Sequence, residues 1–244
     1  MTTRLKRWDE NLWTADGELR APLGIVFPIR MTVVRSGRSL TLISPIALDA
    51  ALTAELAECG EVEALVSPNL MHHLFLPAAV ERFPNAEVYG PQGLEKKQPS
   101  LSFSPLPDHG GAPFSDALDI FAIEGIPALT EHAFWHPSTR TLVVTDLIFN
   151  LQGAKNWISR FVFGRISGVL GGPAQSRLVK WATKDRPAAG RSVEHLLALD
   201  FNRLVMAHGE VLDDGGKDAL AAATGWMRGQ TTARALEAAE PGSY

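Results

Sequence analysis

The sequence predicts a layered α/β protein. Three observations lead to this fold class: short β-branched and aromatic segments over residues 8–45, alternating helical and strand patterns over residues 45–90, and further strand patterns between residues 119 and 207. No linker or internal repeat divides the 244 residues. We therefore expect a single domain over residues 1–244, which is long enough to bury a large core.

The composition excludes several classes of protein. A hydrophobic share of 45% and a charged share of 20% are ordinary for a globular protein, and a net charge of -4 argues against a dedicated nucleic-acid binder. The single cysteine, Cys59, excludes a disulfide framework and a multi-cysteine zinc cage. No signal peptide and no apolar span of about 20 residues is present, so we expect a cytoplasmic protein without a transmembrane segment.

The first half of the chain begins with hairpins and continues with a parallel unit. Residues 8–45 contain short strand patterns with a turn signal at Arg35-Ser36-Gly37-Arg38. Helical patterns at 45–60 and 74–83 then alternate with strand patterns. Those strand patterns lie at 63–67 and 87–90. A strand, helix, strand, helix, strand order predicts parallel strands with right-handed connections.

The second half is predicted to form another set of strands. Residues 91–118 are rich in Pro, Ser, Gly and Asp and are expected to be mostly loop, with His109 as a solvated loop residue. Strand patterns follow at 119–125, 131–136, 141–145 and 203–207, and helical patterns at 190–200 and 217–239. The arrangement is consistent with a second sheet that has its own helical cover.

Three predicted strands end in side chains that can bind a metal. His72 and His73 follow the strand at 63–67, Asp146 follows the strand at 141–145, and His208 follows the strand at 203–207. The C-terminal ends of strands in a layered α/β fold face a crevice, where sites are built. Imidazoles with a carboxylate are ligands for a divalent ion in a catalytic site. For the adjacent imidazoles, a capping or surface role is the alternative.

The order of elements resembles the metallo-β-lactamase fold, an αββα sandwich with its site at the edge between two sheets. The narrower resemblance, over about residues 8–230, is to an uncharacterised branch of that superfamily, a domain of unknown function. It implies a four-layer α/β (α+β) architecture. The segments that carry it are Pro68-Asn69 with His72-His73-Leu74-Phe75, Tyr89-Gly90-Pro91-Gln92-Gly93-Leu94 with Lys96-Lys97, Glu131 with Phe134 and His136, Thr145-Asp146-Leu147-Ile148-Phe149-Asn150, and Ala207-His208-Gly209.

The hallmark motif of the superfamily, Thr-His-x-His-x-Asp-His, is only half present. Aligned with residues 67–73, its last His is His73 and its Asp is replaced by His72. The first two His positions hold Pro68 and Leu70. The resemblance therefore implies a degenerate motif in which the ligands of one of two metal sites are missing.

The third motif of the superfamily supports the same interpretation. Its His, some twenty residues before the later Asp, falls near Pro127 and is lost unless Glu131 or His132 replaces it. In a typical two-metal member, this His and the first two His of the hallmark form one metal site. The resemblance thus implies that the whole of that site is gone.

The second metal site of the superfamily is largely retained. His73, Asp146 and His208 match its ligands, and His72 stands in place of its Asp. The hypothesis is one divalent ion, with zinc favoured and iron or manganese as alternatives, held by His72 or His73 together with Asp146 and His208. Glu131 is the candidate fourth ligand or general base.

A metal ion at this place would activate water for attack on an ester, lactone, thioester or phosphodiester of a small-molecule substrate. Glu131 or His136 would manage the proton. Because side chains alternate along a strand, these two residues point to opposite faces unless the strand bulges. Sequence analysis thus favours a metal-dependent hydrolase-like protein.

Other functions stay open from the sequence. A degenerate member could bind a small molecule or a metal without turnover, or use the metal in redox chemistry. Residues 147–170 combine Trp157, Phe161 and Phe163 with basic residues. We expect this stretch to cover the sheet or to form a homodimer contact, with a membrane-surface or lid role as the alternative.

Overall fold

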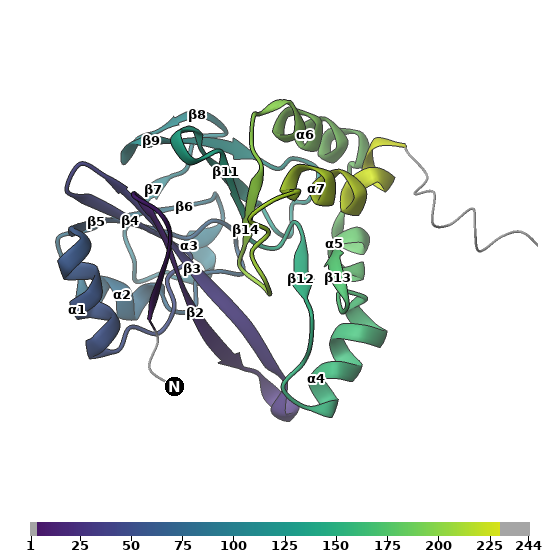
Figure 1. Ribbon diagram of the computed structural model, residues 1–244, viewed down its shortest axis with the longest axis horizontal. Helices are drawn as coiled ribbons and strands as arrows, with labels where there is room; N and C mark the ends of the chain where they lie inside the picture. The colour runs from purple at the N-terminus through teal and green to yellow at the C-terminus, as the bar shows by residue number, and fades with distance from the viewer. Residues whose placement is uncertain (1–3, 230–244) are drawn as a thin grey trace, which may run out of the picture.

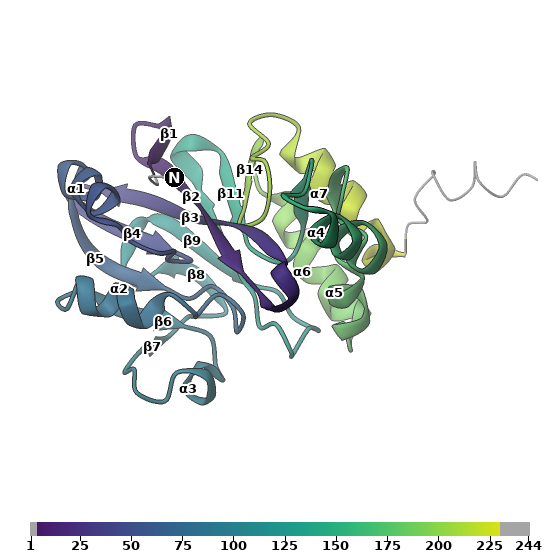
Figure 2. The same ribbon diagram turned by 90° about the horizontal axis from the view of Figure 1, so that it is seen from below.

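The computed structural model describes residues 4–229 and shows four layers in the order helix, sheet, sheet, helix, as predicted (Figures 1 and 2). The first sheet has its strands in chain order: β1 (Leu5–Asp9), β2 (Leu12–Arg20), β3 (Val26–Ser36), β4 (Ser39–Ile43), β5 (Glu61–Val66), β6 (Glu87–Gly90) and β7 (Ser104–Pro105). A short 3₁₀ turn, η1 (Pro22–Gly24), joins β2 to β3. The strands β1 to β4 pair antiparallel, which confirms the predicted hairpins.

The parallel unit predicted for residues 45–90 is confirmed. Strands β4, β5 and β6 pair in parallel and are connected by α1 (Ala50–Cys59) and α2 (Leu76–Arg82). Helix α1 begins at residue 50 because the Asp49 side chain accepts a hydrogen bond from the Leu52 N–H at 2.7 Å, which caps the helix. A further short helix, α3 (Leu94–Lys97), lies beyond β6.

Side chains alternate across the first sheet and divide the core. The paired residues Leu42 and Leu65 point to the helical layer of α1, α2 and α3, whereas the next pair, Ile43 and Val66, points to the second sheet. A strand that is buried on both faces reads as a continuous apolar run. This explains why the sequence of β5 ends in Ala-Leu-Val.

The second sheet has the strand order β14, β11, β10, β9, β8. Its strands are β8 (His109–Ala112), β9 (Ser115–Ala122), β10 (His132–His136), β11 (Thr141–Val144) and β14 (Arg203–Met206). Helices α6 (Arg186–Ala198) and α7 (Gly216–Thr224) cover its outer face, where Leu142, Leu196 and Leu204 share one apolar cluster (Figure 1). Strand β11 is antiparallel to β10 and parallel to β14.

A smaller region joins the two halves near one end of the sandwich. It comprises β12 (Phe149–Leu151), α4 (Trp157–Phe161), the π-helical turn η3 (Val162–Ser167), β13 (Gly172–Ala174) and α5 (Arg177–Ala182). A separate 3₁₀ turn, η2 (Pro137–Thr139), joins β10 to β11 in the second sheet. Within the smaller region, Phe163 is buried against Phe149, whereas Trp157 keeps 77% of its surface exposed. The stretch 147–170 therefore covers the sheet only in part, and the homodimer contact stays a prediction.

Two segments differ from the sequence-based prediction. Residues 91–118 were expected to be mostly loop, yet they contain α3, β7 and β8. Strand β8 is rich in Gly and pairs with β9 through its backbone, so its side chains carry no strand pattern. The last predicted helix ends as α7 and the 3₁₀ turn η4 (Gly225–Arg228), and its expected continuation over 230–239 lies outside the described residues. Among residues 4–229, no helix is long and apolar enough to cross a membrane.

Candidate metal centre

Three strand ends from the two sheets bring His72, Asp146 and His208 together. His72 lies in the turn after β5, and the other two residues follow β11 and β14. These two strands are parallel, with Val144 opposite Met206, so Asp146 and His208 leave the sheet at the same level. The site therefore lies at the edge of the sandwich, where the first sheet meets the second.

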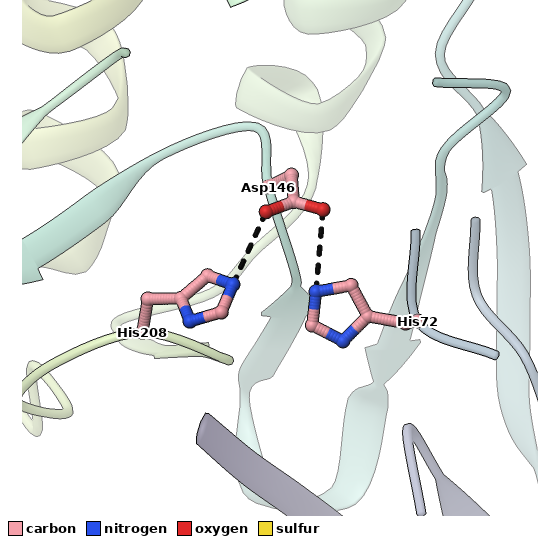
Figure 3. Close-up of side chains that lie close together, drawn as sticks. All are labelled: His72, Asp146 and His208. Atoms are coloured by element: carbon pink, nitrogen blue, oxygen red, sulfur yellow. Dashed lines mark hydrogen bonds and ion pairs between the residues drawn. The ribbon is translucent and has the colours of Figure 1, made fainter. Parts of the chain in front are cut away.

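Asp146 is the centre of the group (Figure 3). Its Oδ2 lies 3.2 Å from His72 Nε2, and its Oδ1 lies 3.2 Å from His208 Nε2. One ligand atom from each residue lies within 4.8 Å of the others, a spacing at which one ion can contact all three. Asp146 and His208 are buried. Two nitrogens and one oxygen form the donor set typical of a catalytic zinc site.

Both imidazoles are oriented through their Nδ1 atoms. His208 Nδ1 donates to the Pro28 carbonyl oxygen at 2.7 Å, and His72 Nδ1 lies 2.7 Å from Ser44 Oγ. Phe149 stacks on the His208 ring with centroids 4.9 Å apart. Partners of this kind, which hold the nitrogen remote from the metal, are usual around metal-ligating His. The two rings thus present Nε2 to the centre of the site.

The hydrogen bond from His208 to Pro28 indicates that a positive charge is needed between His208 Nε2 and the Asp146 carboxylate. A carbonyl only accepts, so Nδ1 of His208 carries the proton and a neutral ring has a lone pair on Nε2. That lone pair would face the Asp146 carboxylate at 3.2 Å, an unfavourable contact between two acceptors. A proton on Nε2 or a cation between the two groups removes the conflict. The residues present therefore fit a divalent ion.

The pKa of Asp146 follows from the same charges. Burial alone would raise its pKa, but the electrostatic attraction and the hydrogen bonds of His72 and His208 outweigh burial and hold it well below its usual range. The carboxylate is thus ionised at neutral pH. An ionised carboxylate is the form that binds a metal.

Gly209 holds His208 in place. Its φ is +95°, and a Cβ atom at this position would lie 2.0 Å from the Asn150 carbonyl oxygen. The backbone of Asn150 pairs here with both neighbours of Gly209, donating to His208 and accepting from Glu210. Gly209 is therefore required because β12 passes too close to its backbone to leave room for a side chain.

Asn69 connects the two halves of the site and was not predicted as a site residue. Its amide Nδ2 donates to Asp146 Oδ2 at 2.8 Å and to Thr145 Oγ1 at 2.9 Å. Its Oδ1 accepts from the backbone N–H groups of Met71 and His72. The local signal was the Pro-Asn dipeptide, since Asn side chains commonly bond the backbone two residues on. Its contact with Asp146 could not be read from the sequence.

Glu131 lies behind the site and supports the loop that carries Asp146. Its buried carboxylate accepts from the backbone N–H groups of Thr145, Asp146 and Leu147 at 2.8, 2.8 and 3.2 Å. Burial and the nearby Asp146 carboxylate raise its pKa to about 7 despite these hydrogen bonds. Both carboxylate oxygens accept from the backbone and Glu131 is not in the converging group, so its expected role as fourth ligand or general base stays a prediction.

His73 and His136 lie outside the group. His73 Nδ1 accepts from the Gln98 side chain at 2.8 Å, and its ring is not among the converging ligands. His136 pairs with Thr141 at the far end of β10, five residues and roughly 17 Å along the strand from Glu131. The expectation that His136 manages a proton at the site is therefore corrected by its position.

His132 does not replace the missing third-motif His either. Among residues 4–229, His72, Asp146 and His208 form the one group of three or more His, Cys, Asp or Glu side chains with metal-binding spacing. His132 is buried, and neither of its ring nitrogens has a hydrogen-bond partner. Burial lowers its pKa.

We expect His132→Leu to raise the free energy of unfolding by about 1 kcal/mol at about pH 8, because it removes two unpaired buried nitrogens. The gain should be larger at about pH 5. The native pKa is depressed, so the unfolded wild type takes up a proton that the folded state does not, and the wild type loses stability as pH falls. Urea unfolding at both pH values measures this. The exposed His195→Leu control should show no comparable gain.

Comparisons with known proteins identify a family for the chain and solved structures with a similar fold. A family described as Domain of unknown function (DUF4336) matches residues 9–161, and no curated protein matches in sequence. Among solved structures, the metallo-β-lactamase from Pontibacter korlensis superimposes with a TM-score of 0.65 at 16% identity, covering 94% of this chain and 100% of its own. The metallo-β-lactamase from Hirschia baltica gives 0.64 at 11% identity, with 93% and 98% covered. The metallo-β-lactamase FIM-1 from Pseudomonas aeruginosa, in its mono-zinc form, gives 0.62 at 13% identity, with 93% and 97% covered.

Proposed function

The chain belongs to the DUF4336 family and has the metallo-β-lactamase fold, and on this basis we propose that it is a metal-dependent hydrolase with a single divalent ion. The observation that carries the proposal is the convergence of His72, Asp146 and His208 from three strand ends. Zinc is the favoured ion, since two imidazoles and a carboxylate leave an open position typical of catalytic zinc. The mono-zinc form of the P. aeruginosa relative supports a one-ion centre within this fold.

The residues of this chain have distinct tasks in the proposed reaction. When bound, a divalent ion lowers the pKa of water towards neutrality and polarises the oxygen of the bond to be cleaved. His72 and His208 supply nitrogens whose direction is fixed by Ser44 and Pro28. Asp146 supplies negative charge and stays ionised at neutral pH. These side chains are already oriented before any ligand binds.

The reaction adds water across an acyl or phosphoryl bond. The water oxygen attaches to the carbonyl carbon or phosphorus, and its proton passes to the departing alkoxide or thiolate. Esters, lactones, thioesters and phosphodiesters all react in this way. The proposal thus covers four substrate classes, which share an oxygen that a cation polarises.

Calorimetric titration of the metal-free protein with Zn²⁺ should give a stoichiometry of one ion per chain. With zinc added, the protein should hydrolyse at least one of p-nitrophenyl acetate, a γ-lactone, an acyl thioester and bis(p-nitrophenyl) phosphate, and EDTA should abolish the activity. Asp146→Asn should remove both ion binding and turnover, since it takes away the only carboxylate in the group. Two ions per chain, or activity that survives EDTA, would contradict the proposal.

A binding protein without turnover is the second candidate. It is favoured by the structure around Glu131, whose carboxylate accepts hydrogen bonds from three backbone N–H groups and is not among the converging ligands. One bound zinc ion with no hydrolysis of any substrate in the panel would support this candidate over the hydrolase. The same titration therefore distinguishes the two.

A further inference from the structure

A cavity of about 420 Å³ opens directly onto the candidate metal centre. His72, Asp146 and His208 line it together with side chains from β2 and β3 of the first sheet, from β12 and from α5. Its volume is within the range of small-molecule sites. The cavity is thus the place where a substrate of the proposed hydrolase would lie.

The walls of this cavity are almost entirely apolar. Phe27, Ile46, Leu129, Phe163 and Val179 are among the lining side chains. Apart from the three candidate ligands, the polar lining side chains are three serines. Contact of this apolar wall with a hydrocarbon chain, in place of water, lowers the free energy of the bound state.

The charge of the cavity separates the substrate classes. No Lys or Arg among residues 4–229 lines it, and Asp146 is the one carboxylate that does. Apart from the proposed ion, whose charge Asp146 partly balances, an anionic phosphodiester would find no cationic side chain to replace its hydration, and burying a charge with few partners is costly. Neutral acyl bonds meet no such penalty. The lining therefore favours esters, lactones and thioesters over phosphodiesters.

The mouth of the cavity extends the apolar surface outwards. Met71, Leu74, Leu178 and Trp181 all line the cavity, yet between 54% and 74% of each side chain's surface remains exposed. They come from the turn after β5 and from α5, so they lie on two sides of the opening. Exposed large apolar side chains gathered at a cavity mark a binding surface.

We propose that the substrate of this centre is a neutral acyl compound with a long hydrocarbon chain. The carbonyl lies at the end of the cavity that holds Asp146, and the chain runs along the apolar wall towards Trp181 and Leu178. The assignment of a carbonyl rests on the proposed hydrolase function. The binding of the hydrocarbon chain rests on the cavity alone and can be tested without turnover.

Displacement of Nile red by straight-chain alcohols, from butanol to dodecanol, tests chain binding. Affinity should rise about fourfold for each methylene until the cavity is full. The EDTA-treated wild type should bind the alcohols as the zinc-loaded protein does, because no metal is needed for this binding. Affinity that does not depend on chain length would overturn the proposal, whatever the protein hydrolyses.

Two variants locate the binding in this cavity. Ala128→Trp places an indole at an exposed position of the wall, and Leu178→Asp places a charge at the mouth, in the first turn of α5 where an acidic residue suits the helix. Each should weaken dodecanol binding at least about tenfold, the cost of losing roughly two buried methylenes. The matched control Ala54→Trp, on the exposed face of α1, should change nothing. Equal loss in the control, or no loss in both cavity variants, would overturn the assignment.

Hydrolysis then reports on the carbonyl. For the zinc-loaded protein, the KM of p-nitrophenyl esters should fall with the same chain-length dependence from butyrate to decanoate. Alcohol binding that depends on chain length, without ester hydrolysis, would support the hydrocarbon site and contradict the hydrolase function. Hydrolysis of short esters with no dependence on chain length would support the hydrolase function and contradict the hydrocarbon site.

Discussion

Replacing His72 by alanine is expected to weaken zinc binding by at least about 100-fold, whereas the same change at His73 should leave the affinity nearly unchanged. Loss of partners that only orient a ligand costs about 10–100-fold in metal affinity, and loss of a ligand itself should cost more. His72 Nε2 lies 3.2 Å from Asp146 Oδ2, while His73 Nδ1 faces Gln98. Competition with a chromogenic zinc chelator measures both affinities.

The two variants control for each other. Both remove one imidazole from adjacent positions of the same turn, so the change in total charge and composition is identical. If His73→Ala loses the ion and His72→Ala keeps it, His73 is the ligand, as the hallmark alignment indicates. That result would contradict the assignment of His72 from the structure. Equal losses would indicate that the turn itself, rather than one side chain, governs binding.

This pair also shows what sequence reasoning about the site leaves open, since it named His72 or His73 as the ligand without choosing between them. Alignment with the hallmark motif identifies His73 as the retained ligand, because it matches residue types by position. In a helical turn, successive side chains point about 100° apart, so only one of two neighbours can face a given site. The structure brings His72 into the group and turns His73 to Gln98. Which neighbour faces inwards depends on how the turn packs, and the motif does not contain this information.

The fold was more accessible to prediction than the site. Local patterns such as the apolar run of β5 or the cap at Asp49 depend on neighbours in sequence, so they are visible in the chain. The supports of the site depend on distant pairs instead. Asn69 and Asp146 are 77 residues apart, and His208 and Pro28 are 180 residues apart. Each pair is joined by a hydrogen bond between two polar groups. The residues that flank one partner in the sequence do not indicate which distant residue is the other partner.

Glu131→Gln is expected to reduce the free energy of unfolding by about 3 kcal/mol or more. The carboxylate accepts three backbone N–H groups from the loop that carries Asp146, and it is buried. A Gln side chain has the same shape but replaces one acceptor oxygen with an NH₂ group, which would face N–H donors. Each buried donor without a partner costs about 1–3 kcal/mol. Urea unfolding of the metal-free protein measures the loss.

The matched control is Glu124→Gln, an exposed position just beyond the neighbouring strand β9. A surface change of this kind should alter stability by no more than about 0.5 kcal/mol. A similarly small effect at Glu131 would mean that the loop holds Asp146 without its carboxylate. Large destabilisation confined to Glu131 would instead identify this residue as structural support. Since the loop positions the only carboxylate of the candidate centre, the same variant should also weaken zinc binding at temperatures where it is still folded.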